Sequence, residues 1–381
     1  MVRKNTNCES TLPLTISAQY GLVDQITYFN NRVASRDVTN YYLVLNGEFA
    51  YNKSTSDGYP FGAVKRLDMY EKGVLSTLYI VFVPKDKYRV NSNFLTIFFD
   101  TNRWHKGVAE RAAEGARNHG LLNITADDFF DIDLLLPKEI GEQAKIGEFV
   151  QKLDALITLH QRKLDKLINV KKSMLEKMFP KQGSTVPEIR FTGFTNDWEQ
   201  RKLGELLTRY TDEVNVPHNG YERLGIRSHA KGTFHSYVSE GHELQTGKMH
   251  KVAADKFIVN ITFGWEHAVA VTDKNDAGKL VSHRFPQYSL SENLYSKFFK
   301  YIILDDKFKH HLWLSSPGGA GRNRVLKLDE MLEYKIKIPN VQEQQKIAEV
   351  LMDLDNLITL HQCELEKLQN IKKSMLEKMF V

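Results

Sequence analysis

The sequence predicts an α+β protein: two globular domains separated by two long helices, which form an antiparallel coiled coil in a pseudo-two-fold internal repeat. Two observations predict this fold. A segment that ends in KKSMLEKMF occurs twice, and both copies have the apolar spacing of a coiled coil. The length of 381 residues also exceeds what one hydrophobic core usually serves, which favours more than one domain.

The repeat is the strongest signal in the chain. Residues 142–179 and 343–380 align at a constant offset of 201, and 26 of the 38 pairs are identical. The globular parts repeat only faintly, in that residues 49–54 can be laid over residues 257–262. Because a period of about 200 residues is too long for a solenoid, we interpret the chain as two copies of a domain followed by a helix.

In each repeated segment, ten positions follow one another at alternating steps of four and three residues, the spacing of the interface of a coiled coil. We name these positions the seam. Eight of the ten seam positions in each copy are apolar. Pro137 and Pro339 precede the helices, and Pro180 ends the first one. His160 and His361 occupy one seam position, where a polar side chain fixes register at some cost in stability. We expect no metal at these histidines, because no carboxylate or cysteine shares the seam. Two copies that face each other favour antiparallel pairing.

The globular parts mix strand and helix patterns. Residues 78–83 and 257–262 are typical of strands, residues 94–104 and 295–313 of short helices, and a strand-like stretch precedes both Pro137 and Pro339. No βαβ rhythm appears, which favours the α+β class. The expected segments are a first globular domain at 1–135, a central helix at 136–180, a linker at 181–197, a second globular domain at 198–337 and a C-terminal helix at 338–381.

The composition is that of an ordinary soluble globular protein. Two cysteines, Cys8 and Cys363, cannot build a disulfide framework. The longest apolar runs last about six residues, far below the ~20 that span a membrane. The first residues have no apolar stretch of a secretory signal. We therefore expect a cytoplasmic protein that does not bind a membrane.

Motifs for catalysis are absent from the sequence. Residues 241–249 resemble a phosphate-binding loop, but five residues separate the glycines and Met249 stands where Ser or Thr would reach magnesium. Glu333 and Lys335 have the E-x-K spacing of some nucleases, a triplet that arises often by chance in charged chains. We expect no catalytic residue, no metal and no cofactor in this chain.

Charge and loop composition permit DNA binding. The net charge of +5 divides into 0 for residues 1–135, +3 for 136–180, +4 for 181–338 and −2 for 339–381. This excess is weaker than that of a domain that binds duplex DNA unaided, which indicates that partners would share the phosphate contacts.

Loops of both globular domains carry donors that can recognise base edges, each bidentate pair contributing ~1–3 kcal/mol of discrimination. The alternative is that Asn52, Asn260 and the Arg-Asn pairs satisfy turns. The candidate DNA-binding residues are Ser17, Gln19, Tyr20, Asn52, Lys53, Arg117 and Asn118 in the first domain, and Arg227, Ser228, His229, Lys231, Asn260, Thr262, Arg322, Asn323 and Arg324 in the second.

Identity between the helices extends beyond the seam. An outward surface that each half offers to the same partner explains this, and recent gene conversion is the alternative. The candidate partner-binding residues are Leu156, Leu159, Lys172, Leu175 and Phe179 in the first helix, and Leu357, Leu360, Lys373, Leu376 and Phe380 in the second.

Two divergent domains, each followed by a near-identical helix that ends in KKSMLEKMF, resemble the specificity (S) subunit of a type I restriction-modification system. The PEIRFTGF stretch at 187–194 and WEQRKLG at 198–204 are similar to the segment that leads into this family's target recognition domains. We name residues 187–207 the lead-in segment. The first domain departs from the family pattern because it has no counterpart of this segment.

The resemblance implies a non-enzymatic subunit whose two target recognition domains each recognise half of a split double-stranded DNA target, with the helices as spacer. It also implies that two modification (methyltransferase) subunits dock on the helical regions. Those subunits would supply adenine methylation that depends on S-adenosylmethionine, and would recruit restriction subunits where the system has them. The second hypothesis is a coiled-coil interaction scaffold whose end domains bind proteins.

Overall fold

The computed structural model describes residues 3–17, 20–112, 120–243, 247–318 and 324–380. The chain forms two compact units: unit 1 comprises Met1–Arg162 with Gln362–Val381, and unit 2 comprises Lys163–His361. Each unit contains both strands and helices and its own hydrophobic core, which confirms the predicted α+β class. In the described part of the chain, no helix combines the length and the apolar character that crossing a membrane requires.

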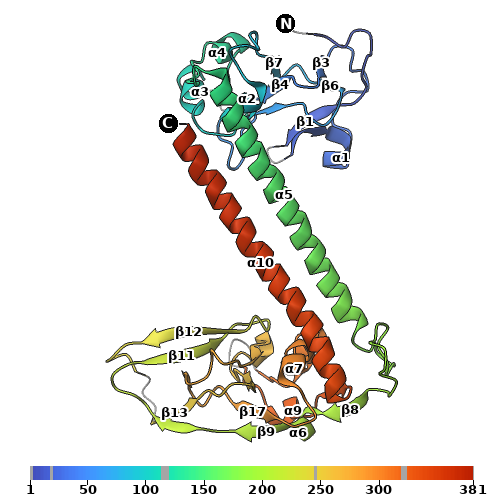
Figure 1. The fold of residues 1–381 in the computed structure, drawn as a ribbon, viewed down its shortest axis with the longest axis vertical. Helices are drawn as coiled ribbons and strands as arrows, with labels where there is room; N and C mark the ends of the chain where they lie inside the picture. Colours follow the sequence, from blue (N-terminus) through green and yellow to red (C-terminus); the bar gives the residue numbers. More distant parts are fainter. Residues whose placement is uncertain (1–2, 18–19, 113–119, 244–246, 319–323, 381) are drawn as a thin grey trace. The chain divides into compact units, whose positions relative to one another are not determined.

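Unit 1 is built around a three-stranded antiparallel sheet in the order β5-β4-β7, with β4 in the centre (Figure 1). Two further strand pairs, β1-β2 and β3-β6, adjoin it. The elements before the long helices are β1 (Leu14–Ser17), β2 (Gly21–Asp24), α1 (Gln25–Phe29), β3 (Tyr42–Leu45), β4 (Phe49–Asn52), β5 (Ala63–Arg66), β6 (Lys72–Leu75), β7 (Ile80–Phe82), α2 (Ser92–Phe99), α3 (His105–Arg111) and α4 (Ala126–Phe130).

Unit 2 contains a four-stranded antiparallel sheet, β15-β14-β17-β9, a five-stranded sheet, β10-β13-β16-β11-β12, and the pair β18-β8. Its elements are β8 (Glu199–Lys202), α6 (Leu203–Leu206), β9 (Leu207–Tyr210), β10 (Glu213–Asn215), β11 (Tyr221–Ile226), β12 (Thr233–Val238), β13 (Lys248–Lys251), β14 (Lys256–Val259), η1 (Gly264–Glu266), β15 (Val269–Val271), β16 (Leu280–Val281), β17 (Gln287–Leu290), α7 (Ser296–Ile302), α8 (Asp306–Leu314), α9 (Leu328–Leu332) and β18 (Lys335–Ile338).

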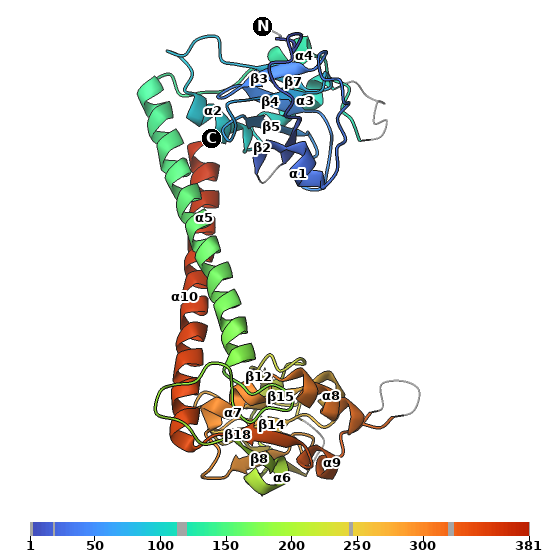
Figure 2. The ribbon, with the colours of Figure 1, turned by 90° about the vertical axis from the view of Figure 1, so that its right-hand side faces the viewer.

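The two long helices, α5 (Ile140–Lys177) and α10 (Val341–Met379), each contribute residues to both units. In unit 1, Asp154 accepts a hydrogen bond from Lys372 at 2.6 Å, and His160 lies 3.0 Å from Glu364. Residue numbers therefore rise along one helix as they fall along the other, so the helices run antiparallel in this unit. They lie side by side there in Figure 1 and in Figure 2. The expectation that no carboxylate shares the seam was wrong, because Glu364 contacts His160.

The predicted helix at 295–313 is two helices. Asp305 accepts a hydrogen bond from the backbone N–H of Lys307 and caps the start of α8, which separates it from α7. A side chain that caps backbone donors can begin a new helix inside a stretch whose apolar spacing alone would continue the first one. The predicted helix at 94–104 also ends earlier than expected, at Phe99, where no side chain caps the next helix. The strand-like stretch before Pro339 forms β18, whereas residues 133–136 before Pro137 form no strand.

The last residue shared by both repeats, Phe179 or Phe380, packs inside a unit. In unit 1, Phe380 is buried and stacks on Phe94 with ring centroids 5.2 Å apart. In unit 2, Phe179 stacks on Phe298 at 5.5 Å. The prediction of an outward partner-binding face was therefore wrong for these two residues. Leu175 and Leu376 are also partly buried against the same cores.

Candidate nucleic-acid interface

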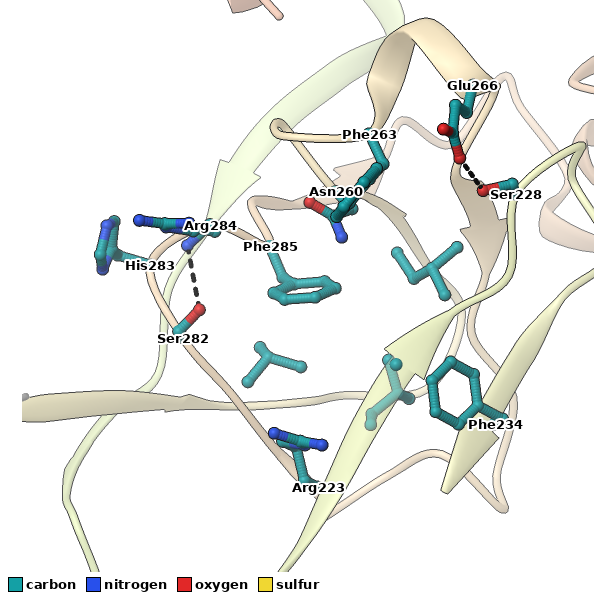
Figure 3. A pocket seen from close by; sticks show the side chains of 14 residues that line it. Arg223, Ser228, Phe234, Asn260, Phe263, Glu266, Ser282, His283, Arg284 and Phe285 are labelled. Atoms are coloured by element: carbon teal, nitrogen blue, oxygen red, sulfur yellow. Dashed lines mark hydrogen bonds between the residues drawn. The ribbon is translucent and has the colours of Figure 1, made fainter. Parts of the chain in front are cut away.

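A hollow of about 690 Å³ lies in unit 2 between three connections: the β11-β12 hairpin, the loop after β14 and the loop between β16 and β17 (Figure 3). Its floor is apolar and includes Phe234 and Phe285. Charged and polar side chains surround this floor: Arg223, Ser228, Asn260, Glu266, His283 and Arg284. A shallow apolar hollow with cationic and amide groups at its edge suits a ligand that is both polyanionic and aromatic.

The tip of the β11-β12 hairpin is held against η1. His229 and Ala230 have left-handed backbone conformations, with φ of 61° and 50°. Their N–H groups donate to the carbonyls of Glu266 and His267, both at 2.8 Å. The Ser228 hydroxyl donates to the Glu266 carboxylate at 2.5 Å (Figure 3). Ser228 and His229 are therefore positioning groups for the tip, and Lys231 is exposed beside them.

Arg227 is exposed but tied to its own hairpin. Its guanidinium donates to the carbonyl of Thr233 and lies over the ring of Phe234, 5.3 Å from the ring centroid. These two contacts hold the guanidinium against its own hairpin. Arg227 lies between Ile226 and Ser228, which both line the hollow, but Arg227 is not itself one of the lining residues.

Asn260 and Asn52 both hold turns, as the alternative interpretation of the sequence proposed. The Asn260 side-chain oxygen accepts from the backbone N–H and the hydroxyl of Thr262, at 3.1 and 2.7 Å. The Asn52 oxygen accepts from the Ser54 N–H at 3.0 Å. Asn260 nevertheless lines the hollow, and its amide nitrogen points toward it (Figure 3).

Sequence reasoning missed two arginines and one histidine at this hollow: Arg223, Arg284 and His283. Arg223 extends from β11 on one side, and His283 and Arg284 lie on the loop opposite (Figure 3). His283 and Arg284 are exposed, and the Arg284 guanidinium makes no hydrogen bond or ion pair with any described residue. The sequence signal was an SHR triplet directly after a short buried strand. This triplet becomes part of a candidate site only because the β11-β12 hairpin lies across the hollow from it.

A second cationic and aromatic group lies at Arg324. Its guanidinium carbon is 5.0 Å from the ring centroid of Trp313 and 5.9 Å from that of Trp265. Trp313 is about half exposed and also stacks on His310 at 6.0 Å. The neighbouring candidates Arg322 and Asn323 lie outside the described residues.

The candidates in unit 1 are more dispersed. Ser17 is buried and its hydroxyl oxygen accepts from the Tyr20 N–H at 3.2 Å, so the prediction of base contact was wrong for Ser17. Tyr20 is exposed. Lys53 donates to the carbonyl of Ile124 at 3.2 Å, which directs its ammonium group into the domain. Gln19, Arg117 and Asn118 lie outside the described residues.

Histidines and the E-x-K pair have structural partners. Burial lowers the pKa of His267, whose neutral ring donates to the Ile303 carbonyl at 2.7 Å. Glu333 accepts a hydrogen bond from Lys202 at 2.6 Å, and this bond lowers the pKa of the exposed Glu333 carboxyl group. This ion pair between β8 and the C-cap residue of α9 explains Glu333 without nuclease chemistry.

The remaining partner-binding candidates are exposed on the long helices. Leu156 and Leu159 in unit 1 have exposed fractions of 44% and 47%, and their repeat partners Leu357 and Leu360 in unit 2 have 43% and 52%. Lys172 and Lys373 are exposed as well. Each unit thus presents the same two leucines from a helix.

The chain is similar to known DNA specificity proteins. The family described as the type I restriction modification DNA specificity domain matches residues 37–169 and 195–370. The type I restriction enzyme MjaVIII specificity subunit of Methanocaldococcus jannaschii is 22% identical over 321 residues, which cover 80% of this chain and 73% of that protein.

A putative type I restriction enzyme MjaX specificity subunit of the same organism is 22% identical over 353 residues, covering 90% of this chain and 80% of that protein. The type I restriction-modification S subunit from M. genitalium has a related fold, with a TM-score of 0.54 at 12% identity over 92% of this chain and 87% of that one. Since the family matches more than half of the chain, this protein belongs to the family of type I restriction-modification DNA specificity subunits.

Proposed function

We propose that this chain recognises a bipartite double-stranded DNA target, one half through the globular domain of unit 1 and the other through that of unit 2. In this proposal α5 and α10 form one antiparallel coiled coil with pseudo-two-fold symmetry and act as the spacer. The observation that carries the proposal is the use of equivalent helix residues for the same contact in each unit.

The equivalent contacts begin with a buried glutamine. Gln143 accepts from the N–H of Asn91 at the start of α2, and donates to the carbonyls of Arg89 and Pro137. Its repeat partner Gln344 makes the same three bonds in unit 2, to Tyr295, Asn293 and Pro339.

The ion pairs between the helices are also equivalent in the two units, but the helix that supplies the lysine in one unit supplies the aspartate in the other. Unit 1 pairs Lys372 with Asp154 at 2.6 Å, and unit 2 pairs Lys171 with Asp355 at 2.5 Å. At the offset of 201, Lys372 corresponds to Lys171 and Asp355 to Asp154. This reciprocity is the pattern of an isologous interface. It supports a single scaffold that carries two different DNA-recognition domains.

In unit 2 we assign DNA contact to the edge of the hollow: Arg223, His283 and Arg284, together with Arg227, Lys231 and Arg324. The guanidinium of each of these arginines can bind guanine bidentately or a phosphate as a charge-assisted pair, and the Lys231 ammonium can pair with a phosphate, so the set serves both base recognition and positioning. In unit 1, Tyr20 remains a candidate, as do Gln19, Arg117 and Asn118, which lie outside the described residues.

The chain itself supplies no catalytic group in this proposal. Two modification subunits dock on the helices, where Leu156 and Leu159 in unit 1 and Leu357 and Leu360 in unit 2 present equivalent apolar surfaces. Those subunits bind S-adenosylmethionine and methylate adenine, and restriction subunits join where the system encodes them.

The test is methylome sequencing of cells that carry Arg284→Ala, with exposed Lys274→Ala in the same unit as the matched control. We expect Arg284→Ala to relax the half-site read by unit 2 and to leave the other half unchanged, because base discrimination of ~1–3 kcal/mol is lost at one position. Equal loss at both halves, or an unchanged methylome in every variant of the hollow, contradicts the proposal.

A further inference from the structure

The turn between β16 and β17, residues 282–285, places His283 and Arg284 at the hollow of unit 2. One serine holds its backbone. The Ser282 hydroxyl oxygen accepts from the Arg284 N–H at 3.4 Å (Figure 3), and the Ser282 carbonyl accepts from the Phe285 N–H at 3.0 Å. The two central residues of the turn are exposed, whereas the first and the last are partly buried. The turn therefore presents its two central side chains to solvent.

The turn between β6 and β7 in unit 1, residues 76–79, is built in the same way. The Ser76 hydroxyl oxygen accepts from the Leu78 N–H at 3.4 Å, and the Ser76 carbonyl accepts from the Tyr79 N–H at 3.2 Å. Thr77 and Leu78 are exposed, and the residues on either side of them are partly buried. The exposed fraction of Leu78 is 61%. The two turns thus share their backbone bonds and their pattern of burial.

The strands around the two turns also have the same register. In unit 1, Tyr42 of β3 is opposite Leu75 of β6. In unit 2, His250 lies 208 positions after Tyr42 and is opposite Val281, which lies 206 positions after Leu75. The same two offsets relate the paired residues of β4 and β7 to those of β14 and β17. The two turns are therefore equivalent positions of the two globular domains.

The other connections that surround the hollow have counterparts in unit 1 as well. Asn52 at the end of β4 and Asn260 after β14 each accept from the backbone N–H two residues later, at 3.0 and 3.1 Å. In each unit, the chain at the first strand of a hairpin, β1-β2 or β11-β12, forms a parallel bridge with β6 or β16. The Thr15 hydroxyl of β1 lies 3.4 Å from the Tyr79 hydroxyl, which connects the hairpin of unit 1 to its turn.

We propose that Leu78 is a specificity-determining residue of unit 1 and recognises a T·A base pair through the 5-methyl group of thymine. This assignment rests on the proposed function, in which Arg284 at the equivalent position of unit 2 contacts DNA. An aliphatic side chain has no hydrogen-bonding group, and the thymine methyl is the apolar group that a base pair presents in the major groove. Equivalent turns thus recognise different bases in the two half-sites, because their exposed residues differ.

The charges of the two domains agree with this difference. Residues 1–135 have no net charge, whereas residues 181–338 have a net charge of +4. A domain that recognises a base through a methyl contact needs no cation at that position, and the phosphate contacts are shared with partner subunits.

The test measures methylation of duplex DNA by the complex of this chain with its modification subunits. The half-site of unit 1 is the one that Arg284→Ala leaves unchanged, and deoxyuridine replaces one of its thymidines at a time. Deoxyuridine lacks only the 5-methyl group and keeps the base pairing. For the parent chain, we expect one such replacement to slow methylation about fourfold, the effect of one methyl group that loses its contact. With Leu78→Ala, the same replacement should have no effect.

Leu135→Ala is the matched control, because it removes the same atoms from another exposed leucine of unit 1 and should keep the fourfold effect. Equal sensitivity to deoxyuridine in the parent and in Leu78→Ala overturns the proposal. A half-site of unit 1 that contains no thymidine, or that tolerates deoxyuridine at every thymidine, also overturns it. The proposed function survives these outcomes if Arg284→Ala still relaxes the other half-site. If Arg284→Ala relaxes neither half-site, both proposals fail.

Discussion

Units 1 and 2 use the same helix residues on globular domains that differ greatly. Phe380 inserts beside Phe94 and Phe98 in unit 1, while Phe179 inserts beside Phe298 and Trp198 in unit 2. Among the described residues, the aromatic rings that contact Phe380 belong to α2, whereas Phe179 also contacts Trp198 of the lead-in segment. The comparison indicates that the phenylalanine at the end of each helix packs into a globular domain, and that each domain provides different residues for this contact.

The largest expected effect on stability comes from removing the aromatic contact at the end of each helix. Phe380→Ala should destabilise unit 1 by about 3 kcal/mol, since truncation of a buried Phe leaves a cavity. Phe179→Ala should destabilise unit 2 by less, because Phe179 is only partly buried. Hydrogen exchange of the α2 and α7 amides in moderate urea measures each unit separately.

Phe380→Leu is the control, because a smaller change in volume costs under about 1.5 kcal/mol. Loss of protection in α7 upon Phe380→Ala, with α2 unaffected, would contradict the assignment of this residue to unit 1.

A smaller loss of stability is expected when the buried glutamine of either unit is replaced. Gln143→Ala and Gln344→Ala should each cost about 2–3 kcal/mol, because three backbone groups lose a partner in each unit. The two losses should be equal, since the three bonds are the same. Denaturation midpoints and unit-resolved exchange measure them, with exposed Gln345→Ala within about 0.5 kcal/mol of the parent as control. A loss of stability in only one unit would show that the two glutamines make the same bonds but do not contribute equally to stability.

The smallest effect concerns the exchanged ion pairs. Asp355 accepts from Lys171 and from the Tyr301 hydroxyl at 2.8 Å, whereas Asp154 binds Lys372. Burial, and then the bond to Asp355, raises the pKa of Tyr301 above its usual range, so the hydroxyl keeps its proton. Asp355→Asn should therefore cost about 1 kcal/mol and Asp154→Asn about half of that.

Thermal melts at low salt and in 1 M salt measure both ion-pair variants. The difference between Asp154→Asn and the parent should shrink at 1 M salt, where charges are screened within ~3 Å. A larger cost for Asp154→Asn than for Asp355→Asn would reverse the comparison.

The helices and their repeat were predictable because a coiled-coil seam is a local pattern of period 3.5 to 3.6. The start of α8 was missed, since its boundary depends on one capping carboxylate, Asp305, inside a helix-favouring stretch. The apolar strands β7 and β14 were found from composition, whereas residues 133–136 had a strand pattern and form no strand. Strand formation needs a neighbour that supplies hydrogen bonds, and a sequence pattern does not supply one.

The candidate site was predictable only in part. Donor-rich loops pointed to the β11-β12 hairpin and to Asn260, but Arg223, His283 and Arg284 join them only because two sheets bring distant loops together.

By itself, the sequence determined that two equivalent helices each serve a divergent domain, because identity at a fixed offset is visible without coordinates. The direction of each off-seam side chain was decided only by the tertiary structure. Phe380 is buried and Phe179 is partly buried, whereas Leu156 and Leu357 are exposed. All four belong to the same identical stretches, so their environments depend on which domain lies against that turn of the helix.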